Sequence, residues 1–167
     1  MCASARFSRP LADRVEVRAP GLAALLVMVV TRLPVSVRRR VLRAAFERAR
    51  DAFNRGDLAA VFGLFARDVE YGPPPPLYTG DPLRGRQAVF NFWHAVFDRY
   101  DENTIENLSL DEATRGSFVR RARLRHRTSA TGASLDYVVV QTTHLKAGRV
   151  VRQVNVLEPG QGNTSQA

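Results

Sequence analysis

The stretch NRGDLAAVF, residues 54–62, decides the fold because it joins two helices through a tight turn. Upstream of it, over Ser36–Arg55, apolar residues recur at three- and four-residue spacing, which predicts a helix with one buried face. Gly56 ends that helix by allowing a left-handed backbone, and Asp57 caps the next helix. The second helix, over residues 58–66, is apolar nearly all round, so we expect it to be buried.

The chain after these helices predicts one further helix and several short strands. Four consecutive prolines after the first strand cannot continue it, because proline lacks a backbone donor. We expect the loop that follows them to lie over an opening. In chain order the predicted segments are a strand Val69–Tyr71, prolines Pro73–Pro76, a loop Leu77–Leu83, a helix Gly85–Tyr100, and strands Thr104–Leu110, Phe118–Thr128, Leu135–Lys146 and Arg149–Leu157.

This order of elements resembles the SnoaL-like branch of the nuclear transport factor 2-like superfamily, over about residues 40–157. The resemblance rests on Asn54-Arg55-Gly56-Asp57, on Asp68-Val69-Glu70-Tyr71 and on the helix that opens with Gly85-Arg86-Gln87. It implies an α+β fold, a cone-shaped barrel of a curved antiparallel sheet wrapped on three N-terminal helices around an apolar pocket. Its motifs specify the fold well and the reaction poorly. It also implies a homodimer through the sheet.

Composition and charge exclude several classes of function. Residues 1–50 hold eleven arginines against three acidic residues, a net charge of +8, whereas residues 51–167 carry only +1. Folds that bind nucleic acid concentrate positive charge on the folded domain, so we expect no nucleic-acid partner. Cys2 is the only cysteine, which favours a reducing compartment and a cytoplasmic location.

Neither a metal nor a cofactor is predicted. His94, His126 and His144 make no spacing typical of metal ligands, and no glycine-rich nucleotide motif is present.

The leader, residues 1–34, leaves three interpretations open. Gly21–Val30 is an apolar run of ten residues, too short for an ordinary membrane span. The first is a disordered arm or the product of a wrong start site, with Met28 as the true start instead of Met1. The second is a peripheral membrane anchor, and the third is a cleaved signal. The predicted domain spans residues 35–158, and residues 159–167 read as a disordered polar tail.

Alternation along the strand Phe118–Thr128 predicts which side chains point inward. Arg121, Arg123, Arg125 and Arg127 share one face, which we expect to be solvated. His126 lies on the opposite parity and therefore points toward the core or pocket. It titrates near neutrality, so it is the candidate catalytic base, with Asp68 as a candidate to orient it.

The predicted pocket is lined mainly by aromatic and amide side chains from several elements, namely Tyr71, Tyr78, Trp93, Phe97, Tyr137, Gln141 and Asn155. In the strands Leu135–Lys146 and Arg149–Leu157 the pattern leaves open which face points inward. The ligand we expect is a small apolar molecule. The candidate functions are a SnoaL-like cyclase, isomerase or dehydratase acting on a small apolar carbonyl compound, a non-catalytic binder, and an interaction module whose leader contacts a membrane weakly.

Comparison with the ketosteroid isomerases of this superfamily argues against their chemistry. The resemblance places Ala49, Gly72 or Tyr71, and Gln141 where those enzymes have a Tyr and two Asp side chains. A base and an acidic donor are both needed for that reaction, so we exclude it. The position of Gln141 nevertheless implies that its amide points inward, where it donates to a ligand oxygen.

Overall fold

A computed structural model describes residues 20–30 and 32–159. Its elements follow in chain order as helices α2 (Pro20–Val30), α3 (Val35–Asn54) and α4 (Leu58–Phe62), strands β1 (Phe65–Gly72) and β2 (Leu83–Arg84), helix α5 (Arg86–Arg99), and strands β3 (Glu102–Thr114), β4 (Ser117–Arg127), β5 (Ser134–Lys146) and β6 (Arg149–Leu157). The α+β fold and all the predicted helices are confirmed, with ends that shift by a few residues.

The six strands form one curved, open sheet in the order β2-β1-β6-β5-β4-β3. Neighbours pair antiparallel except β1 and β6, which run parallel with Tyr71 opposite Gln153. The antiparallel prediction therefore holds for the other pairs and not for this one. Parallel partners need a long crossover, and here α5 and four strands separate β1 from β6 along the chain.

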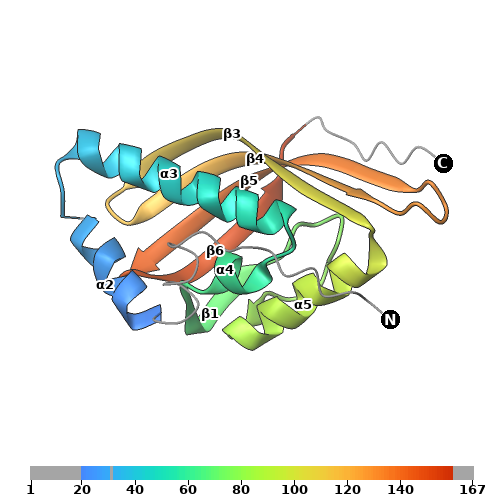
Figure 1. Cartoon of the computed structure of the whole chain (residues 1–167), viewed down its shortest axis with the longest axis horizontal. Coiled ribbons are helices and arrows are strands. Elements are labelled where there is room, and N and C mark those ends of the chain that lie inside the picture. Colours follow the sequence, from blue (N-terminus) through green and yellow to red (C-terminus); the bar gives the residue numbers. More distant parts are fainter. Residues whose placement is uncertain (1–19, 31, 160–167) are drawn as a thin grey trace.

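The helices cover one face of this sheet, and α3 crosses it along its length (Figure 1). Helix α3 contacts β3 and α4, while α5 contacts α4 and β1. Aromatic side chains fill the space between them: the rings of Phe53 and Trp93 meet edge to face with centroids 5.0 Å apart. Such a pair contributes about 1 kcal/mol of stability beyond the contribution from burying its apolar surface.

The turn between α3 and α4 forms as its sequence predicts. Gly56 has a φ of +73°, and the Asp57 carboxylate accepts a hydrogen bond from the backbone N–H of Ala60. Helix α4 is shorter than predicted because β1 begins at Phe65, so the residues from Phe65 onward belong to the sheet. The N–H of Val150 donates to the carbonyl of Leu64 at 3.0 Å, which starts the pairing of β1 with β6.

Helix α2 packs against the turn between β5 and β6. Ala24 is buried there, and a Cβ added to Gly148 would lie 1.8 Å from the Ala24 carbonyl oxygen. Leu25, Leu26 and Val29 on the same helix are about half exposed. Within the described residues, no helix is both long and apolar enough to cross a membrane. Residues 1–19, part of the predicted leader, lie outside the described residues.

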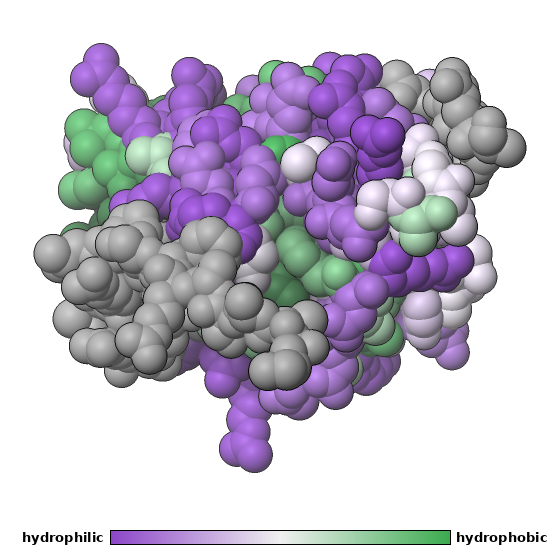
Figure 2. All heavy atoms as spheres, turned by 45° about the vertical axis from the view of Figure 1, so that its right-hand side comes forward, coloured by the Kyte–Doolittle hydropathy of each residue, from purple (hydrophilic) through white to green (hydrophobic). Residues whose placement is uncertain are grey.

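Strand β4 confirms the alternation that its sequence predicts. His126 and Ala122 are fully buried on the inner face, whereas Arg121, Arg125 and Arg127 are exposed on the outer face. The outer arginines meet acidic neighbours: Arg121 pairs with Glu158 at 2.7 Å. Figure 2 shows a face of the molecule that is mostly hydrophilic, with an apolar recess near its middle.

Candidate functional site

A cavity of about 140 Å³ lies between the helices and the inner face of the sheet. Helices α3 and α4 supply much of its apolar wall, and Val27 of α2 also contributes to the lining. Ala45 and Ala49 face it from α3, so the smallest side chains on that side of the helix leave the space open. The lining is mainly apolar, with aromatic side chains from Phe46, Phe53, Phe62, Phe65 and Phe118.

Buried polar side chains of the sheet form the rest of the lining. Arg120 of β4 lies opposite Gln141 of β5 in the strand register, and both are more than nine-tenths buried. Thr143 and Gln153 continue the polar surface, with the Thr143 hydroxyl 3.4 Å from the Gln153 carbonyl oxygen. The cavity therefore joins apolar walls to a patch of hydrogen-bonding groups.

Arg120 has fewer partners than a buried guanidinium normally requires. Its Nη1 donates to Oδ1 of Asn107 at 3.1 Å, and its carbon Cζ lies 5.4 Å from the centroid of the Phe46 ring. Its buried Nε has no hydrogen-bond partner within the described part of the chain. Burial lowers the pKa of Arg120 to about 10, so the side chain is a cation at neutral pH.

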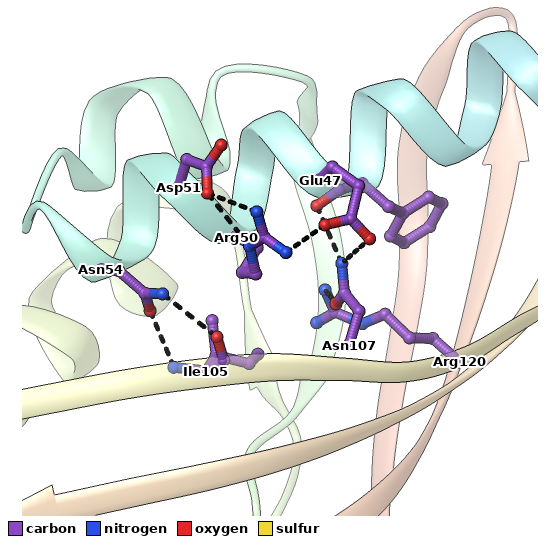
Figure 3. A network of polar contacts seen from close by, with 8 residues as sticks. Glu47, Arg50, Asp51, Asn54, Ile105, Asn107 and Arg120 are labelled. Atoms are coloured by element: carbon purple, nitrogen blue, oxygen red, sulfur yellow. Dashed lines mark hydrogen bonds and ion pairs between the residues drawn. The ribbon is translucent and has the colours of Figure 1, made fainter.

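The carboxylate nearest to Arg120 in this network is already shared between other groups (Figure 3). Glu47 forms an ion pair with Arg50, and the Nδ2 of Asn107 donates to Glu47 Oε1 at 3.0 Å. Asn107 thus links Glu47 to Arg120 without a direct ion pair between the two. The charge of Arg120 is offset only at a distance.

Gln141 is held in place by the neighbouring strand. Its Nε2 donates to Oδ1 of Asn155 at 2.9 Å, and the Nδ2 of Asn155 donates to the carbonyl of Gly72 at 2.8 Å. Tyr71 lies on the same strand as Gly72, and its hydroxyl accepts from Trp93 Nε1 at 3.0 Å. Burial raises the pKa of Tyr71, so its phenol stays protonated and neutral.

His126 is fully buried and fully hydrogen-bonded. Asn103 uses its Nδ2 to donate to the carbonyl of Tyr100, so its Oδ1 accepts from His126 Nδ1 at 2.7 Å. Nε2 then accepts from the Tyr137 hydroxyl at 3.0 Å. Burial lowers the pKa of His126 to about 4, and the ring is neutral at physiological pH.

The inward direction predicted for His126 is therefore confirmed, but the side chain is not part of the cavity lining. Asn103, not Asp68, orients its ring. Asp68 is exposed on β1. The catalytic roles of both residues stay predictions.

Of the predicted pocket residues, Gln141 lines this cavity. Tyr71, Trp93 and Tyr137 are buried in the core beside it, and Asn155 holds Gln141. Tyr78 lies against Phe92 with ring centroids 5.9 Å apart, and Phe97 packs on Phe53. Ligand contacts for these six residues stay predictions.

The principal residue that the sequence reasoning missed is Arg120. It has the same parity as Phe118 and Ala122, so alternation along β4 already places it on the inner face. Arginine is seldom buried without a paired carboxylate, so a buried arginine is not the ordinary expectation at such a position. The signal was an arginine at an inward position in a strand whose other arginines point outward.

The lining offers hydrogen-bond donors and no group that titrates near neutral pH. Among the described residues, no Asp, Glu, His or Tyr lines this cavity, and its charged members are Arg50 and Arg120. Donors of this kind stabilise negative charge on a ligand oxygen but do not remove a proton from carbon. In the described ranges, no three His, Cys, Asp or Glu side chains are grouped to hold a metal ion.

Comparison with known proteins places the chain in a family. Residues 46–153 match the model of the SnoaL-like domain, and no curated protein sequence matches. Because that match spans well over half of the chain, the protein belongs to the SnoaL-like family.

Solved structures with the same fold include three informative relatives. Bal32a, from a soil-derived mobile gene cassette, is 19% identical with a TM-score of 0.61 over 70% of this chain and 88% of its own. IdmH, a candidate polyketide cyclase from Streptomyces antibioticus, is 18% identical with a TM-score of 0.58 over 70% and 91%. TerC, co-crystallised with polyporic acid, is 16% identical with a TM-score of 0.58 over 69% and 89%. At these identities the likeness shows the fold alone.

Proposed function

We propose that this protein binds one small, largely apolar organic molecule in the cavity between α3 and the sheet. The proposal rests on one observation: the same cavity has mainly apolar walls and a buried polar patch formed by Arg120 and Gln141. Protein interiors are close-packed, and an unfilled cavity lowers stability by the contacts it lacks. A retained space with polar groups on one side is typical of small-molecule sites.

The cavity volume limits what it encloses. An engineered cavity of about 150 Å³ in another protein accommodates benzene. The present volume of about 140 Å³ therefore suits a part of the ligand about the size of one six-membered ring. The relatives agree with small-molecule binding as a class, since TerC was crystallised with polyporic acid and IdmH is a candidate cyclase.

Catalysis as a cyclase, isomerase or dehydratase is the second candidate. Arg120 and Gln141 supply donors for an oxyanion, which favours it. Each of these reactions also needs a group that takes a proton, and the described lining provides none. Binding without turnover is therefore the function we favour.

Acetophenone, a one-ring carbonyl compound, tests the binding proposal by calorimetric titration. Ala49→Leu fills the cavity from α3, whereas Ala44→Leu places the same change on the exposed side of the same helix. We expect the dissociation constant to rise at least tenfold in Ala49→Leu and to stay unchanged in Ala44→Leu. Equal affinities in both variants would contradict the proposal, as would a wild-type protein that does not bind.

The same compound separates binding from catalysis. A protein that abstracts a proton next to a carbonyl exchanges the methyl protons of acetophenone with deuterium in heavy water. We expect binding without exchange above the buffer rate, measured by proton NMR. Accelerated exchange that Ala49→Leu abolishes would favour the catalytic candidate instead.

A further inference from the structure

We infer that Arg120 selects ligands that carry a carboxylate, so that the cavity takes a small apolar acid and binds it as the anion. This inference rests on the proposed function and names the class of its ligand. It starts from a guanidinium that is 7% exposed and borders the cavity with its Nε unpartnered in the described part of the chain. Buried donors without a partner are rare, because each costs about 1–3 kcal/mol.

The charges around the cavity leave a positive excess on its lining. Arg50 also lines the cavity, but Asp51 at 2.7 Å and Glu47 both pair with it. Within the described residues Arg120 has no such ion pair, and its bond to Asn107 is to a neutral amide. A ligand anion would supply the negative counter-charge that Arg120 lacks among the residues described. The Nε of Arg120 would donate a hydrogen bond to that anion.

The geometry of the two strands fits a carboxylate group. Arg120 and Gln141 stand opposite each other in the register of β4 and β5, so both reach the same part of the cavity. Guanidinium groups bind carboxylates through two parallel N–H···O bonds, which a single neutral carbonyl cannot match. The apolar remainder of the ligand then lies against Ala49 and Phe53.

Benzoate and benzamide provide the direct test with the full chain. They have nearly the same size and shape, and only benzoate is an anion at pH 7. We expect wild type to bind benzoate about tenfold to a hundredfold more tightly than benzamide, as for other hydrogen bonds that involve a charged group. Equal affinity for the two would overturn the inference.

Variants of Arg120 then assign the preference to this side chain. Arg120→Met keeps the volume and removes the charge, and Arg127→Met does the same at an exposed position on the outer face of β4. We expect Arg120→Met to lose the preference for benzoate and Arg127→Met to keep it. A preference that survives in Arg120→Met would overturn the inference.

The thermal midpoint distinguishes a ligand-binding role from a structural one. Removing a buried charge that has no ion pair with any described residue is expected to leave the midpoint unchanged or raise it. If Arg120→Met fails to fold, Arg120 has a structural role. The comparison of benzoate with benzamide in wild type then decides whether the cavity prefers a carboxylate. If acetophenone binds but benzoate has no advantage, this inference fails and the proposed function stands; if no compound binds, both fail.

Discussion

His126 Nε2 lies 3.0 Å from the hydroxyl oxygen of Tyr137, at a site where neither side chain is more than 1% exposed. The imidazole is neutral there, and its pKa is lowered to about 4 by burial, against about 6.5 in an unfolded chain. The unfolded state therefore binds a proton at a higher pH than the native state does. The free energy of unfolding should fall as the pH drops from about 6.5 to about 4.

We predict a loss of roughly 2–3 kcal/mol from this group between pH 7.5 and pH 4.5, measured by urea unfolding. His126→Gln should flatten that part of the curve. A His126→Gln profile as steep as that of wild type would contradict the assignment.

Asn54 fastens the end of α3 to β3 (Figure 3). Its Oδ1 accepts from the backbone N–H of Ile105 at 2.7 Å, and its Nδ2 donates to the Ile105 carbonyl at 3.2 Å. Asn54→Ala should cost about 2 kcal/mol of unfolding free energy, because two hydrogen bonds are lost. Asn54→Asp keeps the acceptor and should cost less. Asn91→Ala, at an exposed position of α5, should change little. Equal effects of Asn54→Ala and Asn91→Ala would refute this fastening.

Ala49 and Ala52 sit three residues apart on α3 in opposite packing environments. Ala49 borders the cavity, whereas Ala52 is 0% exposed. Ala49→Leu should raise the free energy of unfolding by about 1 kcal/mol by filling empty space. Ala52→Leu should lower it by about 1–3 kcal/mol, because no space is available. Urea unfolding at pH 7.5 measures both, and a matching loss in the two variants would mean that the cavity does not persist in solution.

Gly148 allows α2 to approach the turn between β5 and β6. Its φ is +74°, and a Cβ there would meet the Ala24 carbonyl, whereas a Cβ at Gly132, with a φ of +69°, would meet nothing within 4 Å. Both alanine variants carry the cost of a left-handed backbone, about 1 kcal/mol. We expect Gly148→Ala to cost at least a further 1 kcal/mol in unfolding experiments, since α2 must move. Equal costs would show that α2 does not pack there.

The sequence predicts local structure well where one signal dominates. Gly56 and Asp57 mark the turn between α3 and α4, and the alternation of arginines on β4 predicts its outward face. On β5 the choice of face was open, and burial assigns Tyr137, Val139 and Gln141 to the core. The even-numbered face also carries two apolar residues, Val138 and Val140, so alternation alone could not decide.

A bulge explains why β6 was ambiguous. Leu145 pairs with Val150 while His144 pairs with Arg152, so Val151 is an extra residue and the inward parity changes after it. Val150, Gln153 and Asn155 are all buried as a result. A one-residue insertion in the pairing has no local sequence signal here.

The predicted homodimer through the sheet stays a prediction.

The candidate site was less predictable than the fold because it depends on which helix side chains are small. Alternation along β4 indicates that His126 points inward, and the family resemblance implies the same for Gln141, but the cavity lies beneath Ala45 and Ala49 of α3. Which inward residues border a space and which pack solidly follows from the placement of α3 over the sheet. That placement is a tertiary property, which local sequence patterns do not specify.

The position of a bound small ligand tests the proposed function most directly. Acetophenone bound to methyl-labelled protein should give nuclear Overhauser effects to Val61 of α4 and Leu145 of β5, which both line the cavity. Effects confined to Leu135, which pairs with His126, or to exposed Leu25 would place the ligand elsewhere and contradict the account.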